Sequence, residues 1–259
     1  MAKLVYAYMI EHDPVIPGCV VRSTDFPEEL GRLSYLLSDK TGTLTQNEMV
    51  FKKLHLGSVM FAKDNLDDVK KYLMDSFSQV LNTGADSYLG GTPGGVSAVA
   101  GSSDQRIVQG VRNALMAISV AHNVTPVEEG GKRELQAASP DEVALIHFAE
   151  SVGMLLEQRT ATSVKIRTPT QHTMRFDILC EFPFTSEAKR MGILVRDSDS
   201  GEIFFFCKGA DTVMDRIVRY NDWLDEECGN LAREGLRTLV FAQRRLSEDE
   251  YATFMQRWE

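Results

Sequence analysis

An apolar run leads directly into an acidic motif in the segment Leu33-Ser34-Tyr35-Leu36-Leu37-Ser38-Asp39-Lys40-Thr41-Gly42-Thr43-Leu44-Thr45. The apolar run over 33–37 predicts a short buried strand that ends at the acidic residue. Because open α/β sheets place their sites beyond strand ends, this pattern predicts that Asp39 lies in a site. A single Asp-Lys or Thr-Gly pair would indicate only a turn. Seven consecutive residues over 39–45 favour a chemical role instead.

The carboxylate of Asp39 is suited to attack phosphorus, because a covalent intermediate splits hydrolysis into two easier steps. The attacking carboxylate and a phosphate are both anions, so Mg²⁺ has to bridge them. Lys40 and nearby backbone N–H groups are suited to neutralise the transferring group. The motif therefore predicts phosphoryl transfer to Asp39.

The composition is that of a globular chain of 259 residues, 43% of them hydrophobic, which suffices for one large or two smaller domains. Acidic residues outnumber basic ones by 37 to 28, and the net charge of -9 argues against nucleic acid and anionic lipid surfaces as partners. The four cysteines have no CxxC spacing and the five histidines no ligand pattern, which indicates reduced thiols and no zinc site. No apolar run approaches the roughly 20 residues of a membrane span. We therefore expect the chain by itself to be soluble and monomeric.

The distribution of apolar residues predicts the elements that follow. Helical spacing predicts helices over 66–81, over 107–121, from Ser139 onward, and over 221–234 with Gly235 as the stop. Strands are expected over 49–56, 191–196, 203–208 and 238–242, with the middle two forming a hairpin. Strands grouped with helices, without strict alternation, indicate an α+β body after residue 50.

Two segments predict irregular structure. Residues 14–31 are rich in Pro, Gly and charge and favour an irregular connection. Residues 82–105 are dominated by Gly, Ser, Thr and Asp and predict a flexible Gly-rich insertion. The alternative for the glycines over 90–95 is a phosphate loop, but the Gly-Lys-Ser/Thr ending of such a loop is absent.

The heptapeptide over 39–45 resembles the signature of P-type ATPases, in which the aspartate accepts the γ-phosphate of ATP. It is also similar to the haloacid-dehalogenase superfamily, whose phosphatases carry a second aspartate two residues after the nucleophile as general acid and base. Here that position is Thr41, which leaves an acyl phosphate longer-lived, as a pump requires. The resemblance implies ATP and Mg²⁺ as cofactors, with Asp39, Lys40 and Thr41 catalytic. It implies that the Asp39 carboxylate and the Thr41 backbone hold the Mg²⁺.

Other segments resemble the phospholipid-translocating (class IV) branch of P-type ATPases. They are Pro27–Gly31, Gln46–Met49, Ser139–Glu142, Phe184–Ser186, Lys189–Met191, Lys208–Asp211 and Glu234–Leu239. Residues 221–230 are similar to the Neo1-like subgroup. A cation-transporting P-type ATPase is the alternative, and it would carry other residues at 139–142 and 184–186.

The resemblance implies two domains. An α+β nucleotide-binding domain, an antiparallel sheet flanked by helices, is expected over 51–259. The N-terminal part of a haloacid-dehalogenase-like α/β phosphorylation domain is expected over 1–50. The Thr-Gly-Asp and Gly-Asp-Gly-x-Asn-Asp segments of the family do not follow Arg237. We therefore expect a fragment that binds ATP weakly without turnover, so that a nucleotide-binding module inactive in isolation is a further alternative.

For Glu142, the residues and the resemblance predict different roles. Ser139 at the N-cap, Pro140 at the first helical position and Glu142 at the third form a capping box before an apolar run. The resemblance implies instead that Glu142 faces the nucleotide. Both roles stay open.

For the aromatic residues, the default is core packing, because Phe182 and Phe184 alternate and share one face of a strand. In the family, the phenylalanine before Thr/Ser stacks on adenine, which selects Phe184 and leaves Phe182 in the core. The resemblance also matches Ser186 and Lys189 to neighbouring nucleotide contacts.

Lys208 and Arg237 complete the expected nucleotide site. By its position Lys208 is a solvated strand end, whereas the resemblance of Lys208-Gly209-Ala210-Asp211 implies a lysine lying against the nucleotide. Arg237 suits bidentate contact with phosphate or ribose, and its alternative is a salt bridge with a nearby glutamate.

For the parent protein, the resemblance implies an ATP-driven phospholipid flippase with this chain as its cytosolic-facing part, in Golgi or endosomal membranes. The Neo1-like resemblance implies that no accessory subunit is obligatory.

Overall fold

A computed structural model describes residues 2–46, 48–83, 103–219 and 222–258 of the chain. It divides into two compact units, residues 1–47 and 48–259, which we describe separately. Within the described residues, no helix is both long enough and apolar enough to cross a membrane.

The first unit contains two helices, α1 (Ala2–Glu11) and α2 (Phe26–Leu30). The strand predicted over 33–37 is wrong: these residues have no strand conformation, and the Leu37 side chain is 95% exposed. A buried strand needs neighbouring strands on which to bond and pack. Among residues 2–46 the structure shows only an isolated bridge between Thr41 and Thr45. The haloacid-dehalogenase-like layer is therefore not observed.

The second unit is built on a six-stranded antiparallel sheet in which every strand pairs with its neighbour in sequence, in the order β10-β9-β8-β7-β6-β5. The strands are β5 (Leu155–Arg159), β6 (Ser163–Arg167), β7 (Thr173–Phe182), β8 (Arg190–Asp197), β9 (Ile203–Gly209) and β10 (Val240–Leu246). Two small hairpins accompany this sheet, β1 (Lys53–His55) with β2 (Met60–Ala62) and β3 (Thr125–Glu129) with β4 (Lys132–Gln136).

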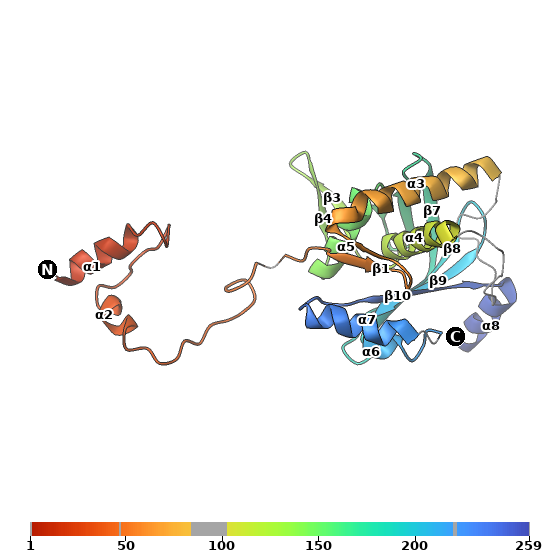
Figure 1. The fold of residues 1–259 in the computed structure, drawn as a ribbon. Coiled ribbons are helices and arrows are strands. Elements are labelled where there is room, and N and C mark those ends of the chain that lie inside the picture. The colour runs from red at the N-terminus through yellow and green to blue at the C-terminus, as the bar shows by residue number, and fades with distance from the viewer. Residues whose placement is uncertain (1, 47, 84–102, 220–221, 259) are drawn as a thin grey trace. The chain divides into compact units, whose positions relative to one another are not determined.

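Helices cover both faces of the large sheet (Figure 1). One face carries α3 (Leu66–Thr83), α4 (Ser103–Val120) and α5 (Pro140–Ser151), and the other carries α6 (Asp211–Met214) and α7 (Asp222–Arg233). A short 3-10 turn (Lys63–Asn65) precedes α3, and α8 (Glu248–Trp258) follows β10.

Successive side chains along β9 point alternately into two different hydrophobic cores, one on each face of the sheet. Phe204 and Phe206 belong to the large core with α3, α4 and α5, whereas Cys207 belongs to the smaller core with α6 and α7. Lys208 has the same parity as Phe206, so its side chain points toward the α4 and α5 face. This parity brings a charged residue next to the start of α5.

The α+β architecture predicted for the body is confirmed. The predicted helices correspond to α3, α4, α5 and α7, and the predicted hairpin is β8–β9. Because α3 extends to Thr83 and α4 begins at Ser103, the middle of the predicted insertion, residues 84–102, lies outside the described residues. The four cysteines are free, as expected.

Candidate functional site

The motif over 39–45 forms a compact turn in the first unit. Gly42 adopts a φ of 78°, in the left-handed region that glycine tolerates best. The amides of Leu44 and Thr45 donate to the Lys40 carbonyl at 3.0 and 3.1 Å, and the Lys40 amide donates to Asp39 Oδ1 at 2.8 Å. The Asp39 carboxylate is exposed, and its oxygens are the hard donors that Mg²⁺ prefers. The Asp39 carboxylate is therefore a donor that suits Mg²⁺, but within the described residues no group of three His, Cys, Asp or Glu side chains could hold a metal ion.

The start of α5 differs from the predicted capping box. Ser139 is the N-cap in extended conformation and Pro140 occupies the first turn, as predicted, but the Ser139 side chain makes no capping hydrogen bond. The Glu142 carboxylate does not return to the cap. Instead, its Oε2 accepts the Asn123 amide at 3.1 Å and its Oε1 accepts Lys208 Nζ at 2.7 Å. A buried ammonium is a stronger partner for a carboxylate than the backbone N–H of the cap.

Lys208 and Glu142 form a largely buried ion pair, with side chains only 9% and 13% exposed. Burial lowers the pKa of Lys208, and the adjacent Glu142 charge opposes that shift. The interpretation of Lys208 as a solvated strand end is therefore wrong. The pair holds a cation on the inner face of the sheet beside the first turn of α5.

The exposed loop between β7 and β8 carries Phe184, Ser186 and Lys189, and Phe184 is 63% exposed. This loop approaches the end of β9, because the Ala210 amide donates to the Lys189 carbonyl at 3.0 Å. A Cβ on Gly209 would lie 2.8 Å from that carbonyl oxygen, so only glycine permits the approach.

Phe182, the last residue of β7, is half-buried and packs edge to face on Phe205 and Phe254. Its ring therefore packs against other aromatic side chains, whereas Phe184 presents a large apolar face to solvent.

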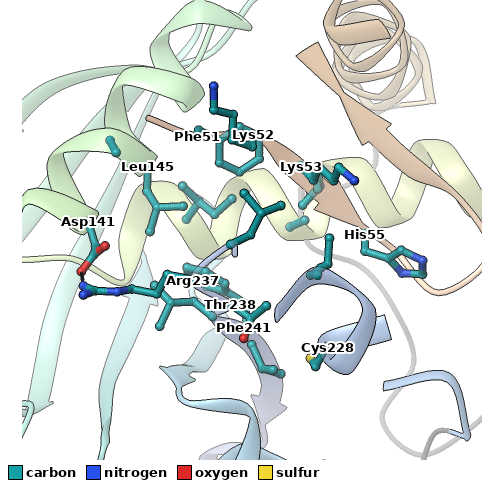
Figure 2. Close-up of a pocket in the computed structure, with 18 of the residues that line it drawn as sticks. Phe51, Lys52, Lys53, His55, Asp141, Leu145, Cys228, Arg237, Thr238 and Phe241 are labelled. Carbon is teal, nitrogen blue, oxygen red and sulfur yellow. Dashed lines mark hydrogen bonds and ion pairs between the residues drawn. The ribbon is translucent and has the colours of Figure 1, made fainter. Parts of the chain in front are cut away.

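Arg237 follows the stop of α7 at Gly235, which has a φ of 78°. Its guanidinium donates to Asp141 at 2.6 Å while its side chain stays 63% exposed (Figure 2). The alternative prediction, that Arg237 forms a salt bridge, is confirmed. Its partner is Asp141, 96 residues away in the sequence, and not a nearby glutamate.

The six residues expected at the nucleotide are linked around one end of the sheet. The strand pairs Met191↔Lys208 and Phe241↔Lys208 put the start of β8, the end of β9 and the start of β10 at the same edge. Glu142 is joined to Lys208, and its neighbour Asp141 is joined to Arg237. The loop with Phe184, Ser186 and Lys189 adjoins the residues directly after Lys208.

A cavity of about 700 Å³ lies beside this cluster, between the 48–56 segment, α4, α5, α7 and β10 (Figure 2). Its walls are mainly apolar and include Phe51, Leu145 and Phe241. Of the six expected site residues, Arg237 alone lines it. The cavity thus adjoins the polar cluster without coinciding with it, and the cations Lys208 and Arg237 of the cluster are paired with Glu142 and Asp141.

Asp141 and Asn123 were not identified from the sequence as parts of the site. Asp141 lies in the Ser139–Glu142 segment, which predicted a helix start and carried part of the family resemblance, but neither pattern predicted a site role for Asp141. Asn123 contributes a backbone amide, which any residue type supplies, so no sequence pattern could have indicated it.

Residues 112–259, more than half of the chain, match the family described as P-type ATPase, cytoplasmic domain N. The chain belongs to the P-type ATPases. The matched part of this P-type ATPase domain runs from α4 through the whole six-stranded sheet and therefore includes the cluster around Lys208.

Curated relatives of this P-type ATPase chain are named as lipid transporters. It is 47% identical to the human "Probable phospholipid-transporting ATPase IIB", over all of this chain and 24% of that protein. It is 48% identical to "Probable phospholipid-transporting ATPase tat-5" of Caenorhabditis elegans, over 98% of this chain and 22% of that protein. It is 46% identical to "Phospholipid-transporting ATPase NEO1" of Saccharomyces cerevisiae, over all of this chain and 22% of that protein.

These relatives confirm the resemblance to the phospholipid-translocating branch, with Neo1 among them. The chain spans about a quarter of the length of the curated relatives it matches.

Proposed function

We propose that the second unit binds ATP at the sheet end bounded by Glu142, Phe184, Lys208 and Arg237. The exposed Phe184 ring offers a flat apolar surface for adenine. In this proposal Glu142 accepts a hydrogen bond from the adenine amino group, since each carboxylate oxygen can accept more than one hydrogen bond. Lys208, Lys189 and Arg237 supply positive charge for phosphate or ribose oxygens, and Ser186 supplies a hydroxyl.

The observation that carries this proposal is the Lys208–Glu142 pair, at 2.7 Å and largely buried. A buried pair of this kind contributes little net stability compared with apolar packing, so its presence suggests a functional role. The loop that carries the exposed Phe184 is bonded to the residues directly after Lys208, and the exposed Arg237 is bonded to the residue before Glu142, which supports a site with both a stacking surface and cations.

We propose further that, in the complete transporter, Asp39 accepts the γ-phosphate with Lys40 and Thr41 beside it. In this proposal residues 1–50 are the start of the phosphorylation domain and residues 51–259 the nucleotide-binding domain. Mg²⁺ held by the Asp39 carboxylate and the Thr41 backbone would neutralise charge on the transferring phosphate. The exposed carboxylate leaves one face open to the phosphate, and the Lys40 amide holds its other side.

The names of the relatives favour a phospholipid as the transported substrate over a cation. We accordingly propose that the complete protein is an ATP-driven phospholipid flippase. From the family resemblance alone we propose further that it acts in Golgi or endosomal membranes and needs no obligatory accessory subunit.

Titration of the 259-residue chain with ATP, followed by NMR, tests the nucleotide site. We expect millimolar ATP to shift resonances of Phe184 and Lys208, and Phe184→Ala to abolish the saturable shift at Lys208. Ile217→Ala is the matched control, because Ile217 is an apolar residue of similar exposure outside the cluster. No shift at millimolar ATP, or identical titrations for wild type and Phe184→Ala, would refute the assignment.

Phosphoryl transfer is tested separately in the full-length parent protein. Incubation with ATP labelled at the γ-phosphate should give an acid-stable, hydroxylamine-sensitive phosphoprotein that Asp39→Asn abolishes. Labelling that persists in Asp39→Asn would place the acceptor elsewhere.

A further inference from the structure

Arg159, the last residue of β5, is a buried arginine outside the expected site, with a side chain only 6% exposed. Its guanidinium contacts four acceptors. Nε donates to the His122 carbonyl at 3.3 Å, Nη2 donates to Asn123 Oδ1 at 3.4 Å and to Glu181, and Nη1 donates to the Thr160 carbonyl. Two of the four acceptors belong to the turn that follows α4.

That turn is rigidly held by His122. The Val124 amide donates to His122 Nδ1 at 3.0 Å, so Nε2 carries the proton and donates to the Ser119 carbonyl at 2.9 Å. Burial, with smaller effects of the Lys208 and Arg159 charges, lowers the pKa of His122 to about 3, which keeps the ring neutral. A neutral imidazole thus bridges the end of α4 to the start of β3.

The same turn reaches the nucleotide cluster through Asn123. Its backbone amide donates to Glu142 Oε2, while its side-chain oxygen accepts from Arg159. Glu142 Oε1 accepts from Lys208. Arg159, Asn123, Glu142 and Lys208 therefore form one continuous chain of polar contacts, and Arg159 and Lys208 stand at its two ends.

We propose that Arg159 is a positioning residue for the nucleotide site. By holding the His122 carbonyl and the Asn123 side chain, it fixes the Asn123 amide, which in turn orients the Glu142 carboxylate toward Lys208. The functional part of this inference rests on the proposed nucleotide site. The orientation of Glu142 by Arg159 does not require a bound nucleotide and can be measured without one.

The geometry favours arginine over lysine at this position. The planar guanidinium presents five donors in a fixed fork, and here it reaches acceptors on the turn after α4, on β7 and at the end of its own strand. A lysine ammonium, with three donors at one point, cannot span the same acceptors. Arg159→Lys should therefore keep the charge but lose the orientation of the turn.

The experiment compares the full 259-residue chain with Arg159→Lys, Arg159→Gln and Arg133→Gln. Arg133 is a matched control, because it also pairs with a carboxylate, Glu150, and donates to a carbonyl, Leu156, but it does not touch the turn after α4. Three quantities are measured for each variant: the Lys208 Nζ and Asn123 amide resonances without nucleotide, the affinity for ATP, and the thermal midpoint.

We expect both Arg159 variants to shift the Lys208 and Asn123 resonances and to weaken ATP binding about tenfold, the size of one charge-assisted hydrogen bond. Arg133→Gln should lower the thermal midpoint and leave both resonances and the ATP affinity unchanged. If Arg159→Gln does not fold, Asn123→Ala replaces it, since it removes the side-chain acceptor of Arg159 on the turn but keeps the Asn123 backbone amide, and the same shift at Lys208 is expected.

Two other outcomes are distinguishable. If Arg159 variants lower the thermal midpoint but leave the Lys208 and Asn123 resonances in place, the positioning role is overturned and Arg159 is purely structural. If the resonances move while the wild-type chain fails to bind ATP, the control of Glu142 by Arg159 stands and the proposed nucleotide function falls.

Discussion

Replacing Lys208 with methionine tests the physical basis of the site most directly. The change keeps the length of the side chain but leaves the Glu142 carboxylate, 13% exposed, without its cation. Removing one partner of a buried pair costs about 3–5 kcal/mol. Because Glu142 Oε2 still accepts a hydrogen bond from the Asn123 amide, we expect a loss of stability at the lower end of this range, about 3 kcal/mol. For a unit of this size that loss corresponds to a fall of about 6–12 °C in the thermal midpoint.

The assay is urea and thermal unfolding of Lys208→Met, Glu142→Gln and the double variant, followed by tryptophan fluorescence. In the double variant no buried charge is left unpaired, so most of the lost stability should return, with a coupling energy of about 2 kcal/mol. A loss below about 1 kcal/mol for Lys208→Met, or a double variant no more stable than Lys208→Met, would contradict this prediction. Either result would mean that water, and not Lys208, compensates the Glu142 charge.

Three further predictions concern the surroundings of the site. The folded-state pKa of His122, about 3, lies below the ordinary value of 6.5, so the free energy of unfolding should fall as the pH drops below 6.5. In urea unfolding at both pH values, His122→Asn should remove about 2 kcal/mol of the stability that is lost between pH 7 and pH 5. Gly209→Ala would set a Cβ 2.7 Å from the Cβ of Arg190 and should lower the free energy of unfolding by about 1–3 kcal/mol, measured by chemical denaturation. In Gly110→Ala the new Cβ would lie 3.5 Å from its nearest neighbour, so this helix substitution should raise the free energy of unfolding by up to about 1 kcal/mol. Arg237→Gln should change stability by less than about 1 kcal/mol but weaken ATP binding in calorimetry, and an unchanged affinity would remove Arg237 from the site.

Local elements of the second unit were predictable because short-range patterns specify them. The apolar spacing over 66–81 and 107–121 marks one helical face, and burial of Leu73 and Leu115 in the structure follows from it. The β8–β9 hairpin follows from two β-rich runs around a glycine-containing loop. Gly235 was identifiable as a helix stop because a left-handed residue there suits glycine.

The run over 33–37 shows where such patterns fail. A helix satisfies its backbone hydrogen bonds within its own segment, but a strand depends on partners elsewhere in the chain. Among the described residues of the first unit no strand pairs with this run, so its apolar residues remain exposed. Apolar composition is therefore not sufficient for a strand.

The helices, the β8–β9 hairpin and the candidate residues were predictable from the amino-acid order, because each depends on neighbours within a few positions or on a short motif. The interactions of the candidate residues depend instead on contacts between segments far apart in the chain. Glu142 fitted a capping box by spacing, yet it pairs with Lys208, 66 residues away, because β9 ends beside the first turn of α5. Arg159 carried no signal at all, since its partners His122 and Asn123 are brought to it by folding. Long-range electrostatic pairing in a buried place is set by the topology of the sheet, and no local pattern encodes it.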